Sequence, residues 1–260
     1  MVLIKGAGDL ATGTAVRLHR AGFRVVMTDI EQPTAVRRTV AFCQCIYDGA
    51  VTVEGITARR ANGKEEALSI LEKGEIPVLV DPEAKILREL PFDNLVDAIL
   101  AKKNMGTKIT DAPVVLALGP GFTAGVDCHG VVETMRGHDL GRLLTEGSAV
   151  PNTGVPGDIG GYTTQRIIRA SADGFFEPVA QIGQAVKEGD LVARVSGIPV
   201  YALMSGMVRG MLPAGLPVTK GMKSGDIDPR CEARHCFTVS DKARAIAGGV
   251  LEGLLYFGKN

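Results

Sequence analysis

The densest group of residues that could carry out chemistry lies between positions 127 and 139, with the sequence DCHGVVETMRGHD. Cys128 could act as a nucleophilic thiolate, and His129 and Glu133 could carry protons. His129 and Glu133 approach each other only if the segment is helical, because the same four residues span about 13 Å of a strand. We therefore predict Cys128, His129 and Glu133 as catalytic candidates. A packed, inert thiol is the alternative for Cys128.

These residue types do not predict a metal centre. A zinc site needs three or four converging ligands, and neither this segment nor a second polar cluster, residues 226 to 236, has a recognised zinc spacing. In the second cluster Arg230 can pair with Asp226 or Asp228, next to a proline that fixes a turn. We expect a salt-bridged turn there and no metal at either place.

A glycine-rich turn near the start of the chain points to a bound anion. It reads GAGDLA from 6 to 11, after an apolar stretch, and matches the G-x-G-x-x-A pattern of dinucleotide-binding units. Gly6 would allow the tight turn, Gly8 the approach of a pyrophosphate, and Ala11 close packing of the next helix. The N-terminus of that helix favours an anion. A structural turn without a ligand remains the alternative.

Two carboxylates bear on the kind of ligand. Asp29 ends the next apolar stretch, where it could accept hydrogen bonds from a ribose diol and would repel a 2′-phosphate, which disfavours NADP. Asp9 stands where the pyrophosphate would lie, so it either caps the helix or argues against an ordinary dehydrogenase. We predict Asp9 and Asp29 as ligand-binding residues together with the three small residues of the turn. A solvated strand end is the alternative for Asp29.

A second glycine loop, GPGFTAG from 119 to 125, follows the apolar stretch from 114 to 118. Loops at the carboxyl ends of parallel strands line the ligand crevice of open α/β sheets. We therefore predict that Gly119, Gly121 and Gly125 hold the other end of an elongated, phosphate-containing small ligand. A turn needed only to reverse the chain is the alternative.

Apolar stretches alternate with helical patterns from residue 1 to 150, which predicts an N-terminal Rossmann-like doubly wound parallel sheet. A glycine- and proline-rich junction follows, and residues 151–238 read as a small β-rich domain. This domain resembles the barrel-sandwich hybrid of biotinyl and lipoyl domains, but its expected hairpin tip, SGIP from 196, has no lysine, so no covalent biotin or lipoate is expected. Residues 239–260 predict a helix, capped by Ser240, that packs back on the core.

The composition of the chain argues against two classes of binding partner, nucleic acids and membranes. Lys and Arg number 29, as do Asp and Glu, so the formal net charge is zero, which argues against nucleic-acid or membrane binding. The absence of Trp, with 5% aromatic residues, argues against base stacking. No apolar run reaches the roughly 18 residues of a membrane span, and the first residues read as a core strand, so we expect a cytoplasmic protein. The five cysteines read as free thiols.

Six blocks spread over nearly the whole chain resemble an accessory family named for the selenium-dependent molybdenum hydroxylase system, distantly similar to the xanthine dehydrogenase accessory proteins. The blocks are GAGDLATG (6–13), EQPTAVRRTV (31–40), VETMRGHDLG (132–141), PNTGVPG (151–157), GDIDPR (225–230) and SDKARAIAGG (240–249). The resemblance implies a maturation protein that binds or delivers a molybdopterin-type cofactor to a target molybdenum hydroxylase, with selenium handling left open.

The residues leave other functions open. An NAD-dependent oxidoreductase using the same crevice is the main alternative, and a docking role for the β-rich half is a third. The carboxylate at position 9 and the lack of an evident acid and base for hydride transfer favour a cofactor-binding maturation factor over an independent catalyst. The sequence does not decide whether a nucleotide is the bound form or whether the protein forms a homo-oligomer.

Overall fold

The computed structural model describes residues 1–155 and 157–258. Position 156 of the predicted junction and positions 259–260 of the predicted C-terminal segment lie outside the described residues. The chain forms two compact units. Unit 1 comprises Met1–Pro33, Ala41–Thr153 and Val239–Asn260, and unit 2 comprises Thr34–Val40 and Gly154–Thr238.

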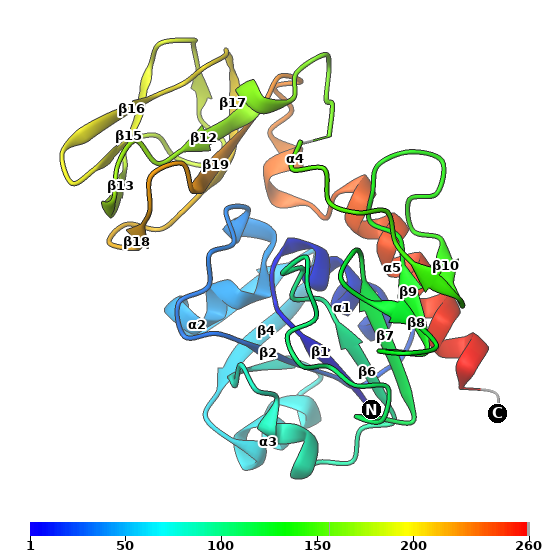
Figure 1. Cartoon of the computed structure of the whole chain (residues 1–260). Coiled ribbons are helices and arrows are strands. Elements are labelled where there is room, and N and C mark those ends of the chain that lie inside the picture. Colours follow the sequence, from blue (N-terminus) through cyan, green and yellow to red (C-terminus); the bar gives the residue numbers. More distant parts are fainter. Residues whose placement is uncertain (156, 259–260) are drawn as a thin grey trace. The chain divides into compact units, whose positions relative to one another are not determined.

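Unit 1 is built on a nine-stranded sheet (Figure 1) in the order β10-β9-β7-β6-β1-β2-β5-β4-β3. Every neighbouring pair from β9 to β4 is parallel, and the outer pairs, β10–β9 and β4–β3, are antiparallel. The strands are β1 (Val2–Lys5), β2 (Val25–Asp29), β3 (Ala50–Val53), β4 (Ile56–Ala61), β5 (Ile76–Val80), β6 (Asn94–Asp97), β7 (Val114–Leu118), β9 (Gly130–Val132) and β10 (Leu143–Leu144). A separate small sheet pairs β8 (Thr123–Ala124) with β11 (Gly147–Ser148).

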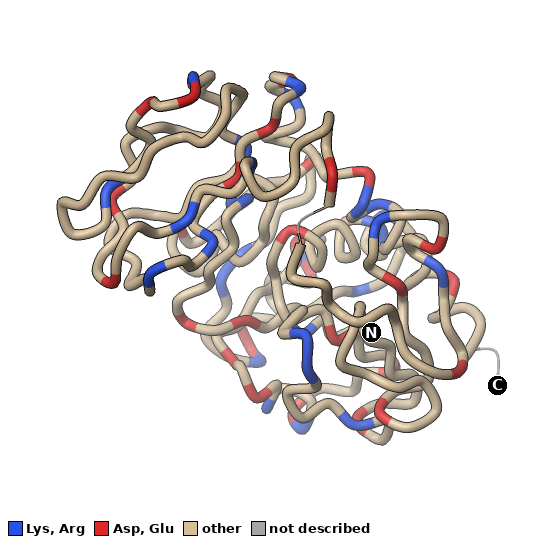
Figure 2. Tube along the Cα trace, turned by 45° about the horizontal axis from the view of Figure 1, so that its top comes forward, with Lys and Arg blue, Asp and Glu red and all other residues tan. Residues whose placement is uncertain are grey.

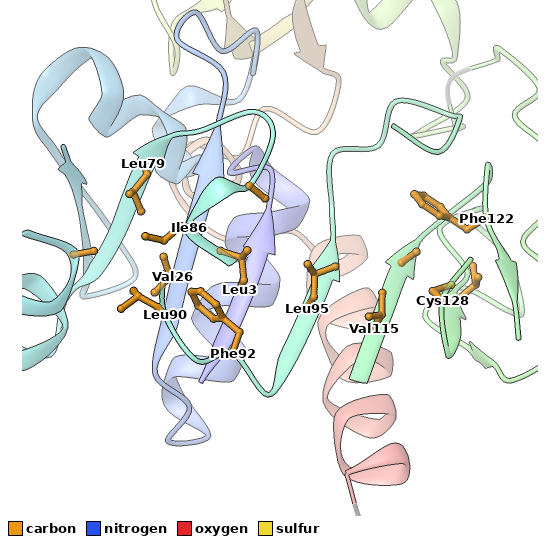
Figure 3. Packing of buried hydrophobic residues seen from close by; sticks show 14 of the residues in the cluster. Leu3, Val26, Leu79, Ile86, Leu90, Phe92, Leu95, Val115, Phe122 and Cys128 are labelled. Carbon is orange, nitrogen blue, oxygen red and sulfur yellow. The ribbon is translucent and has the colours of Figure 1, made fainter. Parts of the chain in front are cut away.

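The central strands of this sheet carry apolar side chains that are buried in the core. All five residues of β7 are buried, as expected for a strand covered on both faces. Leu3, Val26, Leu95 and Val115 lie on neighbouring strands in one cluster (Figure 3), which also contains Ile70 from α3 (Lys64–Glu72). The aliphatic runs of the sequence therefore become the core that holds the strand ends in place.

Two helices that are far apart in the sequence pack together in unit 1. They are α1 (Asp9–Arg20) and α5 (Asp241–Phe257). A Cβ atom built on Gly13 would lie 2.7 Å from the Cβ of Ala243, so only a residue without a side chain fits there. The C-terminal helix predicted from the sequence is present, and the Ser240 hydroxyl accepts the backbone N–H of Ala243 at 3.1 Å.

The predicted doubly wound parallel sheet is wrong, because the sheet is mixed. At one edge a two-residue turn joins β3 to β4 as an antiparallel hairpin, with Glu54 at φ 49° and Gly55 at φ 83°. Positive φ at both central residues is the geometry that matches the twist of a tight hairpin. At the other edge the chain turns back after β9 and pairs β10 antiparallel to it.

Unit 2 consists of two four-stranded sheets in which every pair is antiparallel. One has the order β12-β19-β17-β14 and the other β16-β15-β13-β18. Phe176, Met211 and Leu212 are fully buried in its core. The strands are β12 (Ile167–Arg169), β13 (Gly174–Pro178), β14 (Ala185–Val186), β15 (Leu191–Val195), β16 (Ile198–Tyr201), β17 (Gly206–Met211), β18 (Pro217–Val218) and β19 (Lys223–Asp228). The predicted barrel-sandwich hybrid of biotinyl/lipoyl type is not supported.

The remaining elements are short. They are α2 (Cys45–Asp48) and α4 (Arg234–Phe237), with 3-10 turns at Arg38–Val40, Phe42–Gln44, Lys85–Arg88 and Thr164–Arg166. No helix in the described part of the chain is long and apolar enough to cross a membrane. Basic and acidic residues are interspersed along the trace (Figure 2).

Candidate functional site

Three loops leave the carboxyl ends of neighbouring parallel strands in unit 1. They follow β1, β6 and β7 and comprise residues 6–8, 98–108 and 119–127. The strand order reverses between β1 and β6, because β2 continues on one side of β1 and β6 lies on the other. Ligands of open α/β sheets bind outside the carboxyl ends of the strands at such a switch point.

Two glycines bring these loops into backbone contact. Gly6 has φ 91°, and a Cβ atom there would lie 2.8 Å from the carbonyl oxygen of Ala98. Gly121 has φ 108°, and its Cβ would lie 2.6 Å from Cα of Lys103. A left-handed backbone without a side chain is therefore needed at both positions. The middle loop, residues 98–108, touches the loops on either side of it.

A buried ionic contact fixes the middle loop to the sheet. The Lys5 ammonium, at the end of β1, donates to the Thr107 hydroxyl at 2.6 Å and lies 3.7 Å from the carboxylate of Asp97, at the end of β6. The Thr107 hydroxyl donates to Asp97 at 2.6 Å. Burial of an ion pair needs such additional hydrogen bonds, since desolvation of the two charges is costly.

Asn104 ties the same loop to the one that follows β7. Its side-chain oxygen accepts the N–H groups of Gly106 and Thr107, each at 2.8 Å, and its side-chain nitrogen reaches Asp127 at 3.4 Å. The Asp127 carboxylate also accepts the N–H of Thr123 at 2.8 Å. Side chains thus cross-link the loops where glycines let their backbones meet.

The middle loop carries two residues in a strained conformation. Leu100 has φ 61° and Lys102 has φ 64°, a region that costs a residue with a side chain about 1–3 kcal/mol. Within the described residues Lys102 has no hydrogen bond or ion pair. Lys102 as a whole is exposed, yet partial desolvation of its ammonium lowers the pKa of this group. The loop therefore presents a strained, unpartnered cation at the carboxyl edge of the sheet.

The first glycine loop is held rigidly by its neighbours. The Asp29 carboxylate accepts the N–H of Ala7 and the N–H of Ile30, each at 2.8 Å. The Ala7 carbonyl accepts the N–H of Cys43 at 2.9 Å. Burial raises the pKa of Asp29, and its two hydrogen bonds oppose this shift. Each carboxylate oxygen of Asp29 accepts one backbone N–H, and binding of a ligand by this residue stays a prediction.

The start of α1 is the more open part of this loop. Gly8 precedes the helix, which has no side-chain hydrogen bond at its cap, and a Cβ atom on Gly8 would meet nothing within 4 Å. Asp9 is the first residue of the helix, where a negative charge stabilises the helix dipole. Ala11 is buried in the helix. Gly8 therefore faces open space, whereas Gly6 is required by packing.

The other two predicted glycines have different surroundings. A Cβ on Gly119 would lie 2.5 Å from the hydroxyl oxygen of Thr134. Gly125 has nothing within 4 Å of such an atom, and its N–H donates to the carbonyl of Cys128 at 2.8 Å. Binding of a ligand by Gly119, Gly121 and Gly125 stays a prediction.

The structure does not bring the three catalytic candidates together. His129 and Glu133 flank β9 at its opposite ends. The Nδ1 atom of His129 accepts the N–H of Val115 at 3.0 Å, at the start of β7. The buried Glu133 carboxylate accepts three backbone N–H groups, those of residues 134, 135 and 150. Both side chains therefore hold the backbone, and catalysis by them stays a prediction.

Cys128 lies in the apolar cluster of unit 1 and is fully buried. Burial, with a smaller contribution from the charges of Asp127 and Asp97, raises its pKa to about 12. A thiol with such a pKa stays protonated near neutral pH and is a poor nucleophile. These surroundings match the packed, inert thiol considered as the alternative.

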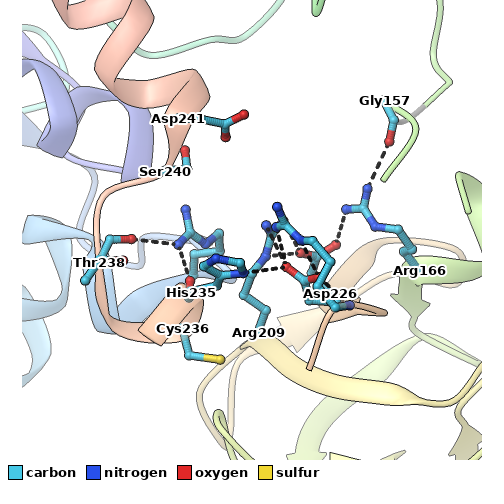
Figure 4. A network of polar contacts seen from close by, with 12 residues as sticks. Gly157, Arg166, Arg209, Asp226, His235, Cys236, Thr238, Ser240 and Asp241 are labelled. Atoms are coloured by element: carbon cyan, nitrogen blue, oxygen red, sulfur yellow. Dashed lines mark hydrogen bonds and ion pairs between the residues drawn. The ribbon is translucent and has the colours of Figure 1, made fainter. Parts of the chain in front are cut away.

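The second polar cluster is a salt-bridged turn, as predicted, and Figure 4 shows its network within unit 2. Arg230 pairs with Asp228 at 2.7 Å, and Asp226 accepts from Arg166 at 2.8 Å and from Arg209 at 2.7 Å. Burial alone would raise the pKa of Asp228, but hydrogen bonds from Arg230 and the charge of Arg209 lower it to about 2. The described residues contain no group of three or more His, Cys, Asp or Glu side chains that could hold a metal ion.

A recess of about 340 Å³ lies elsewhere on the carboxyl edge, at the ends of β4 and β5. Its charged residues include Arg60, Asp81 and Lys85. Each of these three already has a partner, which is a backbone group for Arg60 and Asp81 and a neighbouring carboxylate for Lys85. The recess could hold a ligand by its volume, but these three charged side chains already have partners, whereas Lys102 has none among the described residues.

Several site residues escaped the sequence analysis, namely Lys5, Asp97, Lys102 and Thr107. The mostly apolar residues from 95 to 100 are typical of one strand, but β6 ends at Asp97 and the chain leaves the sheet there. The signal that could have found the loop is its sequence, AKKNMGTK from 101, which is polar and basic directly after an apolar strand.

Comparison with known proteins places the chain beside one curated relative. No family model matches it. It is 54% identical over 255 residues to the uncharacterized protein YqeB of Escherichia coli (strain K12), an alignment that covers 98% of this chain and 47% of that protein. The chain thus spans about half the length of the curated relative it matches.

Solved structures give only distant likenesses. An aspartoacylase family protein from Mesorhizobium loti MAFF303099 is 13% identical, with 87% of this chain and 84% of that chain covered and a TM-score of 0.28. A succinylglutamate desuccinylase from Silicibacter sp. TM1040 is 15% identical over the same shares, with a TM-score of 0.27. Likenesses this weak carry neither fold nor activity over to this chain.

These findings correct the family named from the sequence. No family model matches the chain, and the curated relative does not bear the name of a molybdenum hydroxylase or selenium accessory protein. The maturation role and the molybdopterin cofactor inferred from that resemblance are therefore wrong. The comparisons likewise give no support to the alternative of an NAD-dependent oxidoreductase or to the expected nucleotide cofactor, and both are corrected with the family.

Proposed function

We propose that unit 1 binds a small organic molecule through an anionic group, a carboxylate or a phosphate, at the loops that follow β1, β6 and β7. Lys102 is the cation that pairs with this group. The observation that carries the proposal is its combination of strained backbone and missing partner: φ is 64°, and no hydrogen bond or ion pair reaches its ammonium within the described residues.

The neighbouring loops support such a role because they are ordered in advance. The Lys5–Thr107–Asp97 contacts anchor the middle loop, so Lys102 stands on a segment whose other end is fixed to the sheet. A binding group held by packing and hydrogen bonds loses less freedom when a ligand arrives. The contacts of Lys5, Thr107 and Asp97, and not the ligand, offset the free energy that the positive φ of Lys102 costs.

The first glycine loop supports the same charge preference. Gly8 faces open space and precedes a twelve-residue helix whose first turn has no side-chain cap. The N–H groups of such a turn carry partial positive charge. These N–H groups favour a phosphate or carboxylate, the Asp9 carboxylate in the same turn opposes it, and Lys102 supplies the main attraction.

Calorimetric titration tests the proposal with inorganic phosphate and succinate as probes. We expect the unmodified protein to bind one of them and Lys102→Met to weaken binding about tenfold or more, which corresponds to roughly 1.4 kcal/mol. Lys103→Met is the matched control, since Lys103 is its exposed neighbour and should leave the affinity unchanged.

Proton uptake gives a second readout. Because the pKa of Lys102 is lowered by desolvation, a bound anion should raise it again, so binding at alkaline pH draws a proton from the buffer. Titrations in buffers of different ionisation enthalpy measure this uptake. Equal affinity in the Lys102→Met and Lys103→Met variants, with no proton uptake, would contradict the proposed site.

A further inference from the structure

A groove in unit 2 lies between two edge strands. β12 ends one sheet and β16 ends the other, and the groove between them has a volume of about 390 Å³. An edge strand exposes backbone N–H and C=O groups that no neighbouring strand satisfies. The Ser171 hydroxyl donates to the Ile198 carbonyl at 3.3 Å, so part of this edge is already occupied.

Large apolar side chains line the groove and its rim. Tyr201, the last residue of β16, and Leu203, beyond its end, are 53% and 61% exposed and belong to the lining, and Ile198 at the start of β16 is 49% exposed. Val200, between them, points inward and is buried. Clustered exposure of this kind in one short segment marks an interaction surface more often than a scatter of single residues does.

The charge of the groove has one sign. Arg169 is the single charged residue among the described residues that line it. Across the β12–β19 ladder Arg169 is paired in register with Lys223, and both side chains are exposed. Like charges opposite one another destabilise a sheet. Within the described part of the chain neither residue forms an ion pair, and the Arg169 guanidinium donates to the carbonyl oxygen of Gly221 at 2.9 Å, so no carboxylate neutralises either charge.

We propose that this groove binds an extended segment of a partner protein in which acidic and apolar residues alternate. Carboxylates of the segment pair with Arg169 in the groove and with Lys223, its cross-strand neighbour outside the lining, and its apolar side chains contact Tyr201 and Leu203. Alternating residues of an extended chain point to opposite faces, so one segment presents both kinds of group.

Pairing with a second copy of the chain is the weaker alternative. Pro199 lies in the middle of β16 and has no N–H to donate, so a continuous ladder along this edge is interrupted. Two copies would also bring Arg169 and Lys223 toward the same cations of the partner. Both features disfavour edge-to-edge pairing of two copies. A partner segment would therefore be recognised through the side chains of the groove and not through a continuous backbone ladder.

Fluorescence anisotropy tests the proposal with a labelled peptide of alternating glutamate and valine, beside one of alternating lysine and valine. We expect saturable binding of the acidic peptide alone, which weakens as salt is added. Arg169→Gln and Leu203→Ser should each weaken it by about tenfold. Lys187→Glu, an exposed position outside the lining, should leave it unchanged.

Three results would overturn the proposal. One is the absence of saturable binding up to about 1 mM peptide, and another is equal binding of the two peptides. The third is concentration-dependent dimerisation in sedimentation that Leu203→Ser abolishes, which would assign the groove to a second copy of the chain. Unfolding midpoints of the variants, compared with the unmodified protein, show that any loss of binding is local.

Discussion

The carbonyl oxygen of Ala98 occupies the space where residue 6 would carry a side chain. A Cβ atom on Gly6 would lie 2.8 Å from that oxygen, a distance that would force the loop after β1 away from the loop after β6. The glycine that matches the first position of a nucleotide fingerprint is therefore explained by contact between two loops of the protein itself.

Gly6→Ala should destabilise unit 1 by about 3 kcal/mol, because it combines a left-handed backbone with a backbone clash. Gly22→Ala is a matched control, since Gly22 has φ 89° and nothing within 4 Å of an added Cβ. It should cost only the conformational term, about 1 kcal/mol. Urea unfolding measures both. Equal losses would show that the clash with Ala98 is relieved without cost.

Lys102→Met should raise the unfolding temperature of the ligand-free protein. Burial lowers the pKa of Lys102 below its usual value of 10.5, so the folded state binds the proton less tightly than the unfolded state. Stability of the unmodified protein therefore rises as pH increases from the lowered pKa toward 10.5, and this slope is absent in the variant. A variant that is less stable at every pH would contradict an unpaired, desolvated charge.

Thr107→Val should loosen the middle loop. The change removes the hydroxyl that joins Lys5 to Asp97 and leaves two buried charges at 3.7 Å without their bridge, at a cost of about 1–3 kcal/mol. Hydrogen exchange in residues 98–108 should accelerate more than in the rest of unit 1. Thr110→Val, at an exposed position of the same connection, should change neither quantity.

Asp228→Asn should destabilise unit 2 by about 2 kcal/mol at neutral pH. The hydrogen bonds from Arg230 and the charge of Arg209 lower the pKa of Asp228 from 3.8 to about 2 despite its burial. The stabilisation is therefore present above pH 3.8 and is lost as pH falls through about 2. Unfolding curves of the two proteins should converge at the acid end. A gap that persists there would assign the loss to packing.

Native alkylation should modify one of the five thiols. Cys231 is exposed and the other four are buried. Burial raises the pKa of Cys128 to about 12, so this thiol should react only after unfolding. Intact-mass analysis after iodoacetamide treatment should show a single adduct, and Cys231→Ser should abolish it. Rapid labelling of Cys128 in the folded protein would restore it as a candidate nucleophile.

Local patterns in the sequence were enough to predict the apolar strands and the C-terminal helix. The runs at β1 and β7 are buried strands, and Ser240 caps α5. One of the two glycines inside that helix is required by close packing: a Cβ on Gly249 would collide with the carbonyl oxygen of Gly141, whereas one on Gly248 would meet nothing within 4 Å.

Long-range relationships could not be predicted from the sequence. The mixed sheet depends on a Glu54-Gly55 hairpin whose flanking strands are short and partly exposed, so their periodicity is weak. The partners of Glu133 are backbone groups, one of them 17 residues away, which no side-chain spacing reveals. The site loop was missed because its key contact joins residues 5 and 107. Such contacts follow from topology, not from local pattern.

The pairing of α1 with α5 sets an order of events during synthesis. Unit 1 holds both the first strand and the last helix, whereas residues 154–238 of unit 2 lie between them in the chain. Residue 13 cannot meet residue 243 until α5 has left the ribosome. Unit 2 can therefore reach its native packing first, while β7, β9 and β10 of unit 1 still lack the helix that packs on them. Hydrogen exchange on chains stalled before residue 241 should find unit 2 protected and β7, which α5 contacts in the full chain, still open.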